Sequence, residues 1–383
     1  MACVADRVIQ ISQPDTGDEE WQAVRGPIER GWLTQGPCVA EFERTFGNYI
    51  GATHAIASSN CTTALHLILT AMGIGPGDEV IVPAFTWVAT ANVVVYCGAT
   101  PVFADVSRET FNVDPSQLRS LVTPRTKAII AVHLFGLCAD VDAIRAAIPG
   151  VPIVEDAACA AGSSHRGRFA GRLGTAAAFS FHPRKSITTG EGGMVTTDDA
   201  ALAERVNQLR NHGASMSEEQ RHNGPRPYLL PEFNLLGFNY RMTDLQGAVG
   251  LVQLKKLDRY VDERDRWARF YHDQLAGVPW LRLPALPADA RHGWQSFVCY
   301  VDPPRAPAPR NEIMSRLLER GIHTRSGTHA VHMLGYYRDR FGLKAEDYPA
   351  ARDCDAQTMA IPLHNRMSPD DYQCVVDAIK AIA

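Results

Sequence analysis

The chain has 383 residues, of which 45% are hydrophobic and 21% charged, so it holds enough apolar material for two or three globular domains and shows no signature of disorder. Its net charge of −4 comes from 38 basic and 42 acidic residues mixed along the chain, which excludes a basic stripe for nucleic acid. Nine cysteines without a CxxC pair indicate neither a zinc site nor a disulfide framework.

The hydrophobic runs predict no membrane span. No stretch of about 18 apolar residues occurs, and the N-terminus lacks the apolar core of a secretion signal. We therefore expect a cytoplasmic protein without a membrane partner.

Short β-branched runs alternate with helical patterns between residues 54 and 210. The predicted strands span residues 54–58, 79–83, 127–134, 152–157, 176–182 and 192–197. Helical patterns follow the first three of them, over residues 62–72, 88–96 and 140–148. This alternation is typical of a parallel sheet with helices on its faces. The last three strands are joined by turns too short for helices, so we predict an α/β fold with a mixed, mostly parallel sheet.

The sequence pattern changes after residue 240, from short alternating strands and helices to one long helix. Leu251, Leu254, Leu257 and Val261 recur at helical spacing and predict a long amphipathic helix that bridges two domains. A proline-rich connector, one strand and one helix follow it. We predict a large domain with an N-terminal arm over residues 1–250 and a smaller α/β domain over residues 251–383.

Polar residues follow several predicted strands, where an open α/β sheet binds ligands. Ser58, Ser59 and Asn60 precede a helix that opens with "CTT", which suits either a phosphate or an ordinary helix cap. Trp87 follows the next strand and could stack on a planar group or fill a core.

Two adjacent carboxylates, Glu155 and Asp156, follow the apolar residues of "PIVEDA". Strand alternation lets only one of them point toward the core side of the sheet. Such a carboxylate needs a cationic partner, for which a protonated ring nitrogen would serve, or it is a structural residue that caps a turn.

One lysine, Lys185, lies between a strand and a glycine-rich turn in "FSFHPRKSITTGEGGMVTTD". It is either a solvated loop residue or a lysine that forms a Schiff base. A lysine, a buried carboxylate, an aromatic plate and a phosphate cradle are together what a pyridoxal phosphate pocket requires. The turn "TTGEGG" then leaves backbone space for a substrate beside the lysine.

Several motifs resemble one known family. The segments "GWLTQGPCVAEFE", "SSNCTTALHL", "VEDAACAAG", "FSFHPRKSITTGEGG" and "GFNYRMTDLQGAVG" are similar to those of the DegT/DnrJ/EryC1/StrS sugar-nucleotide aminotransferases. The resemblance covers the chain from about residue 32 to its C-terminus. It implies the aspartate aminotransferase fold (fold type I), pyridoxal 5'-phosphate as cofactor, and a homodimer with shared active sites.

The resemblance also implies roles for individual residues. Lys185 would form the Schiff base and move the proton, and Asp156 would pair with the ring nitrogen. The other cofactor contacts would come from Cys61, Thr62, Trp87, Cys159, Ser180 and, across the dimer, Asn239. The substrate would contact His182, Tyr240 and His329. No residue would bind a metal.

Two of these positions depart from the family pattern. Glycine usually stands where this chain has Cys61, and glycine allows a closer approach of backbone to phosphate. Gln or His usually stands where it has Cys159, and a thiol is a weaker hydrogen-bond partner. We expect the cofactor to be held less tightly as a result.

The lysine segment resembles members that aminate C4 of 4-keto-6-deoxyhexoses, as in perosamine-type synthesis. We therefore expect transfer of an amino group from glutamate or glutamine to such a nucleotide-linked sugar. A C3-keto sugar or a keto cyclitol of antibiotic assembly is the alternative acceptor. A nucleotide-binding oxidoreductase is a different class, but its GxGxxG fingerprint is absent after the first strand.

Overall fold

A mixed seven-stranded sheet forms the centre of the protein in the computed structural model, which describes residues 8–216, 221–222 and 224–382. Residues 1–7, part of the predicted N-terminal arm, lie outside the described residues. The strand order is β1-β10-β9-β6-β5-β2-β4. The strands are β1 (His54–Ser58), β2 (Glu79–Pro83), β4 (Thr100–Ala104), β5 (Thr126–Val132), β6 (Ile153–Asp156), β9 (Ala176–Ser180) and β10 (Gly193–Thr197).

Strand β10 is antiparallel to both of its neighbours, and the other pairs of this sheet are parallel. This confirms the predicted mixed, mostly parallel sheet. β4 is an additional strand beyond the predicted set, and it pairs with β2 at the edge of the sheet.

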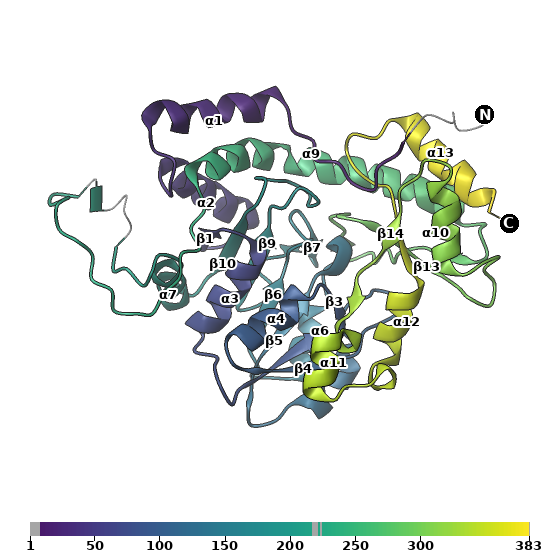
Figure 1. Cartoon of the computed structure of the whole chain (residues 1–383), viewed down its shortest axis with the longest axis horizontal. Helices are drawn as coiled ribbons and strands as arrows, with labels where there is room; N and C mark the ends of the chain where they lie inside the picture. The colour runs from purple at the N-terminus through teal and green to yellow at the C-terminus, as the bar shows by residue number, and fades with distance from the viewer. Residues whose placement is uncertain (1–7, 217–220, 223, 383) are drawn as a thin grey trace.

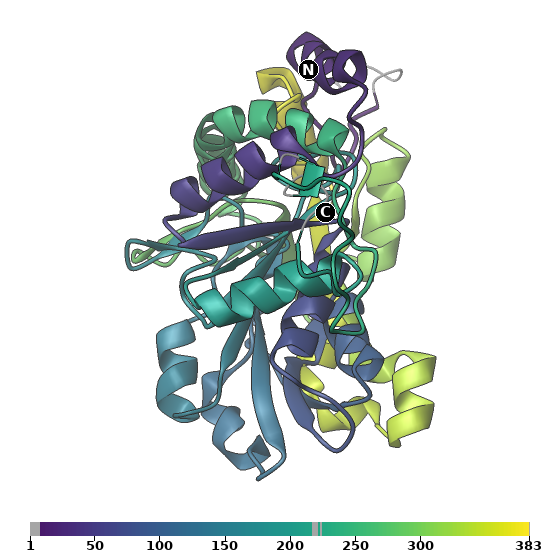
Figure 2. The same cartoon turned by 90° about the vertical axis from the view of Figure 1, so that its left-hand side faces the viewer.

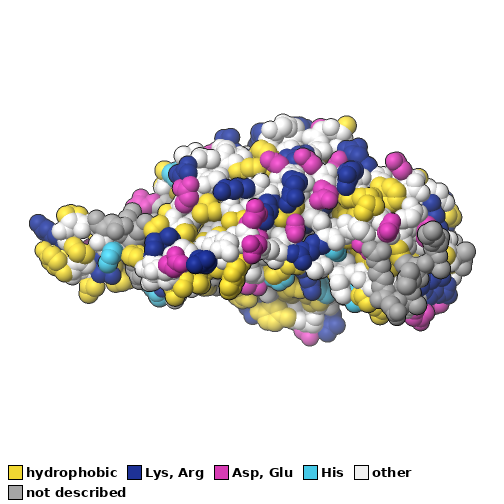
Figure 3. All heavy atoms as spheres, turned by 90° about the horizontal axis from the view of Figure 1, so that it is seen from above, with side chains coloured by type: hydrophobic (Ala, Val, Ile, Leu, Met, Phe, Trp, Pro, Cys, Tyr) yellow, Lys and Arg dark blue, Asp and Glu magenta, His cyan; other side chains and the backbone are white. Residues whose placement is uncertain are grey.

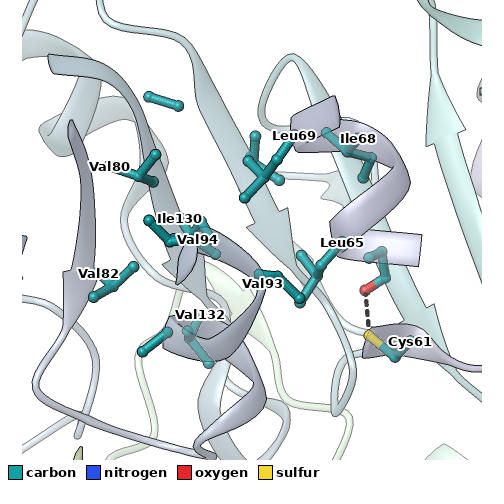
Figure 4. Packing of buried hydrophobic residues seen from close by; sticks show 14 of the residues in the cluster. Cys61, Leu65, Ile68, Leu69, Val80, Val82, Val93, Val94, Ile130 and Val132 are labelled. Atoms are coloured by element: carbon teal, nitrogen blue, oxygen red, sulfur yellow. Dashed lines mark hydrogen bonds between the residues drawn. The ribbon is translucent and has the colours of Figure 1, made fainter. Parts of the chain in front are cut away.

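Alternate residues of each strand face two separate hydrophobic cores. Along β5, Ile129 and Ala131 belong to one core, whereas Ile130 and Val132 belong to the other. Helices α3 (Cys61–Ala71), α4 (Ala89–Tyr96) and α7 (Ala200–Arg210) complete the second of these cores, part of which Figure 4 shows. Helices α2 (Pro37–Ile50) and α6 (Val141–Ala147) complete the first, together with part of α9 (Asp244–Leu275). Helices therefore cover both faces of the sheet (Figure 2).

The predicted bridging helix is α9, which crosses the molecule in Figure 1. It starts at Thr243, whose side chain accepts a hydrogen bond from the Gln246 N–H in a capping box. Leu257 packs in the same core as Ile129 and Ala131 of β5. Tyr271, further along the same helix, packs in a third core. The predicted division after residue 250 falls inside this helix, and it stays a prediction.

A second, four-stranded sheet lies in the C-terminal part of the chain, in the order β11-β13-β16-β14. Its strands are β11 (Leu281–Arg282), β13 (Phe297–Val301), β14 (Arg325–Ser326) and β16 (Thr358–Ile361). Helices α10 (Arg310–Leu318) and α13 (Pro369–Lys380) pack on it with the end of α9. Ile9 joins this third core and pairs with Ile322, so the N-terminal segment also contacts the C-terminal part.

A short antiparallel pair ties the two parts of the chain together beside the large sheet. It consists of β3 (Phe85–Thr86) and β15 (His329–Ala330). The remaining elements are α1 (Asp18–Arg30), α5 (Pro115–Leu118), α11 (Gly335–Phe341), α12 (Pro349–Gln357), β7 (Ser164–His165), β8 (Arg168–Phe169) and β12 (Ala290–Arg291), with four short 3-10 turns. Within the described ranges, no helix is long and apolar enough to cross a bilayer.

Candidate active site

A cavity of about 820 Å³ lies where the parallel strands β5, β6 and β9 end. It is lined by the start of α3, by the residues that follow β3, β5, β6 and β9, and by the C-terminal segment 325–329. The carboxyl ends of parallel strands are where open α/β sheets bind ligands. The β3–β15 pair brings the C-terminal segment to this edge.

Lys185 lies in this cavity, in the loop between β9 and β10. Its backbone N–H donates to the His182 carbonyl at 2.8 Å, which forms a tight turn directly after the strand. The half-buried side chain reaches the turn that follows β6, where its Nζ donates to Cys159 Sγ at 3.3 Å. The amine is therefore held beside the end of a neighbouring strand rather than free in solvent.

Two of the three glycines after Lys185 lie against other parts of the chain. A Cβ on Gly193 would lie 2.4 Å from the carbonyl carbon and oxygen of Asn60, and one on Gly192 would lie 2.3 Å from Thr189 Oγ1. The Asn60 atoms belong to the backbone, so position 193 requires glycine, whereas at position 192 the threonine side chain would have to shift. A Cβ on Gly190 would meet no atom within 4 Å. The predicted space beside the lysine is thus occupied at Gly193 by the start of α3, which the glycine lets β10 approach.

The two adjacent carboxylates of β6 have different surroundings. Asp156 lines the cavity, where its Oδ2 accepts a hydrogen bond from Thr90 Oγ1 at 2.8 Å and its Oδ1 accepts one from the Ala158 N–H at 3.2 Å. Burial raises the pKa of Asp156, because a charge is costly away from water, and the nearby Lys185 partly offsets the shift. A cationic group in the cavity would relieve that cost.

Glu155 points to the other face of the sheet and is fully buried. It accepts hydrogen bonds from the N–H groups of Gly171, Leu173 and Gly174, each at 2.7 Å, and lies 2.8 Å from His133 Nε2. Glu155 is thus the structural carboxylate of the pair, and it anchors the 171–174 turn beneath the sheet.

We expect Glu155→Gln to destabilise the fold by about 3 kcal/mol, because an amide cannot accept all four hydrogen bonds and part of a buried network is left unpaired. Urea unfolding of the cofactor-free protein measures the change. An unfolding free energy within about 0.5 kcal/mol of the wild type would contradict it.

The start of α3 forms a potential anion cradle. The Asn60 side chain accepts the Thr63 N–H at 2.9 Å, which leaves the N–H groups of Cys61 and Thr62 without an intrahelical partner. The Cys61 thiol points away from these groups and donates to the Ala178 carbonyl at 3.5 Å (Figure 4). Its burial raises its pKa well above the ordinary value, so it is a neutral thiol.

Other predicted residues line the same cavity. Trp87 is 61% exposed although it is a large apolar side chain, and its ring lies 5.8 Å from that of His329. Ser180 ends β9 with its hydroxyl beside the cavity, and His182 follows it. Burial lowers the pKa of His182.

Asn239 and Tyr240 are the predicted residues that the structure does not bring to the cavity of this chain. Asn239 is exposed and forms a β-bridge with Asn211. The Tyr240 ring stacks on Phe238 at 4.8 Å and its hydroxyl lies 3.3 Å from His66 Nδ1, on the outer side of α3. The predicted roles of both residues stay predictions, because neither lines the cavity within this chain.

The structure adds residues that the sequence analysis did not single out. Thr90 is bonded to Asp156 from 66 positions away in the chain, and Gln295 and Arg325 reach the cavity from the C-terminal part. No local pattern marks them, because each is an ordinary residue of a helix, loop or strand until the chain folds.

Comparison with known proteins identifies the family of the chain. Residues 14–380 match the model of the DegT/DnrJ/EryC1/StrS aminotransferase family. The spore coat polysaccharide biosynthesis protein SpsC of Bacillus subtilis is 42% identical over 377 residues, which cover 98% of this chain and 97% of that protein.

Solved structures of aminotransferases are also similar to this chain over nearly its whole length. A putative sugar aminotransferase, Spr1654 of Streptococcus pneumoniae in its PLP form, is 28% identical with a TM-score of 0.90, and the match covers 98% of each chain. PseC of Helicobacter pylori, an aminotransferase involved in the biosynthesis of pseudoaminic acid, is 26% identical with a TM-score of 0.90, over 98% of this chain and 99% of PseC.

The cavity fits pyridoxal phosphate. It combines a lysine amine with a buried carboxylate that has no cationic group in direct contact, and it has two free N–H groups at a helix start that suit a phosphate. Trp87 offers an exposed ring face. The predicted cofactor and α/β fold are thereby confirmed, and the oxidoreductase alternative is excluded by the family match. The chain belongs to the DegT/DnrJ/EryC1/StrS aminotransferase family and is a sugar aminotransferase that depends on pyridoxal phosphate.

Proposed function

We propose that this protein transfers the amino group of glutamate, or of glutamine, to C4 of a nucleotide-linked 4-keto-6-deoxyhexose. The observation that carries the proposal is the presence of the Lys185 amine and the Asp156 carboxylate in one cavity of about 820 Å³. A cavity of this size lies at the upper end of the usual range for ligand sites and has room for a substrate beside the cofactor.

Lys185 is the proposed general base and acid. Its Nζ is held by Cys159 in the turn after β6 and can take a proton from the donor carbon and return it to another carbon nearby. When bound, pyridoxal phosphate supplies an electron sink for the negative charge that develops at the reacting carbon. The buried Asp156 carboxylate would keep the ring nitrogen protonated, because a cation beside it is strongly favoured in this site.

The remaining residues would bind and orient the cofactor and the sugar. The N–H groups of Cys61 and Thr62, with the Ser180 hydroxyl, would hold the phosphate, and Trp87 would cover one ring face. His182 and His329 lie at the same cavity and would contact the sugar. The thiol of Cys159 is the proposed neighbour of the ring hydroxyl, where its weak hydrogen bonding would loosen the cofactor.

The names of the relatives favour a sugar acceptor. SpsC is named for polysaccharide biosynthesis and PseC for pseudoaminic acid biosynthesis. Position C4 rests on the similarity of the lysine segment to C4-specific members, and a C3-keto sugar or a keto cyclitol is the second candidate.

An amination panel tests the proposal. The purified protein, loaded with pyridoxal phosphate, is incubated with glutamate or glutamine and with nucleotide-linked 4-keto sugars, 3-keto sugars and keto cyclitols, and the products are weighed by mass spectrometry. We expect a 4-keto-6-deoxyhexose to gain the amine. Turnover of a 3-keto sugar or a cyclitol alone would overturn the C4 assignment.

We also propose a homodimer in which Asn239 reaches the cofactor phosphate of the partner. Residues 224–238 lie on a projecting loop (Figures 1 and 3) and expose apolar side chains, with Leu230 80% and Leu236 92% exposed. Exposed apolar side chains on a protruding segment mark an interaction site.

Sedimentation is expected to give twice the chain mass of 42.0 kDa. Leu236→Asp should weaken the dimer at least about tenfold, because burying a new charge at an interface costs more than 1.4 kcal/mol. Leu286→Asp, an exposed leucine elsewhere, is the control. A wild type that sediments as a monomer at micromolar concentration would refute the shared site.

A further inference from the structure

The amine of Lys185 has a thiol as its neighbour. Its Nζ lies 3.3 Å from Cys159 Sγ, and among the described residues it donates a hydrogen bond to no other group. Reacting atoms that are bound in a productive arrangement lie about 3 to 3.5 Å apart. The sulfur and the nitrogen are therefore close enough to react with each other once one of them is activated.

Both members of this pair are held on turns of the backbone. In the turn that carries Cys159, the Ala160 N–H donates to the Ala157 carbonyl at 2.9 Å. In the turn that carries Lys185, its own N–H donates to the His182 carbonyl at 2.8 Å. A bond between the two side chains therefore needs only rotation of the long lysine side chain, because the backbone already holds the pair together.

Cys159 is also open to small solutes. It is half-buried and lines the cavity of about 820 Å³. Burial raises the pKa of each of the six other free cysteines of the described residues, which favours their unreactive protonated form. Cys61 lines the same cavity, but its thiol donates to the Ala178 carbonyl. Cys159 is thus the cysteine of the cavity that is placed to react.

We propose that a hydroperoxide joins Cys159 to Lys185 through a covalent S–N bond when the cofactor is absent, and that bound pyridoxal phosphate prevents this reaction. The cross-link would consume the amine to which the cofactor attaches, so an oxidised chain could not be loaded until it is reduced. The inference goes beyond the proposed reaction, since it needs neither the amino donor nor the sugar.

The chemistry has two steps. The Cys159 sulfur attacks the peroxide, the O–O bond breaks, and the thiol becomes a sulfenic acid while one molecule of water or alcohol leaves. The Lys185 nitrogen then attacks that sulfur, the S–O bond breaks, and the hydroxyl leaves as water with a proton of the amine. The sulfur loses two electrons to the peroxide, and the chain loses two hydrogens.

A small thiol reverses the cross-link. One thiol attacks the sulfur and frees the Lys185 amine, which leaves Cys159 in a mixed disulfide. A second thiol releases Cys159 and forms the disulfide of the reductant, so the two hydrogens return to the chain.

Peptide mass spectrometry tests the proposal. The cofactor-free protein is treated with hydrogen peroxide and digested without reductant. We expect the peptides that contain Cys159 and Lys185 to be joined, with a mass two hydrogens below their sum. The treated protein should lose its uptake of pyridoxal phosphate, measured by visible absorbance, and regain it with excess dithiothreitol. Protein loaded with excess cofactor should form at least about tenfold less cross-link, because few amines stay free.

Variants separate the two members of the pair. Cys159→Ser should form no cross-link, and Cys159→Ala serves if the serine variant does not fold. Lys185→Ala should gain oxygen on Cys159 without any joined peptides. Cys97→Ser, which changes a half-buried cysteine outside the cavity, is the control and should form the cross-link as the wild type does.

Three results would overturn the proposal. The first is a wild type in which Cys159 gains oxygen and no peptides are joined. The second is a disulfide between Cys61 and Cys159, which also removes two hydrogens but joins different peptides. The third is equal cross-linking of the loaded and the cofactor-free protein. Because no sugar or amino donor is present, failure of the amination panel would leave the cross-link result standing.

Discussion

Lys185→Ala is expected to lower the rate of transamination by at least about a thousandfold, which is the usual share of a general acid–base group. The variant would lose the amine that we propose attaches the cofactor and moves the proton, and no other lysine lines the cavity among the described residues. Its fold should survive, because the side chain is half-buried and, among the described residues, its amine donates a hydrogen bond only to a thiol.

Borohydride reduction followed by peptide mass spectrometry shows which lysine carries the cofactor, independently of the rate of transamination. In the wild type, the cofactor mass should be found on the peptide that contains Lys185, and in the variant on none. Lys255→Ala, an exposed lysine of α9, should behave as the wild type. Cofactor mass on a different lysine of the wild type would refute the assignment.

Asp156→Asn is expected to lower kcat/KM by roughly a hundredfold to several thousandfold, because removal of one charge of a buried pair costs about 3 to 5 kcal/mol. The amide can keep the hydrogen bond from the Ala158 N–H, and the Thr90 hydroxyl can turn to accept from it. The loss would therefore report the missing charge rather than a changed geometry. Steady-state kinetics with the substrate identified in the amination panel measures it.

The same substitution should stabilise the protein without cofactor. The pKa of Asp156 is raised above its ordinary 3.8 in the folded state, so the folded chain binds this proton more tightly than the unfolded chain. The stabilisation from that proton is complete below pH 3.8 and is lost as the pH rises through the folded pKa. An amide avoids this loss.

Thermal unfolding of the cofactor-free proteins from pH 4 to pH 7 tests whether the substitution stabilises the fold and whether the effect grows with pH. Asp156→Asn should unfold about 2 °C above the wild type at pH 7, and the difference should shrink toward pH 4. Glu155→Gln is the contrasting variant, since it should unfold below the wild type at both pH values. A lower melting temperature for Asp156→Asn at pH 7 would show that the carboxylate is structural.

Much of this architecture is predictable from local pattern. The strands and helices between residues 54 and 210 follow from alternating and helical periodicity, and the observed ends differ from the predicted ones by a few residues. Three features of the site are short continuous segments of sequence: the lysine segment, the polar strand ends and the CTT helix start. Their chemistry can therefore be predicted from the sequence alone. Their convergence at one cavity follows from the general rule that ligands bind at the carboxyl ends of parallel strands.

Short motifs that hold neighbouring groups at fixed spacing were enough to predict the family and the cofactor, and they supplied the candidate residues of the site. That Asp156, and not Glu155, faces the cavity is visible only in the folded chain, because strand order and register set that choice. Folding also brings Thr90 to Asp156 and Arg325 to the lining of the cavity, and it leaves Asn239 and Tyr240 outside that lining. Contacts between distant segments are fixed by sheet order and packing, which no local pattern of residues records.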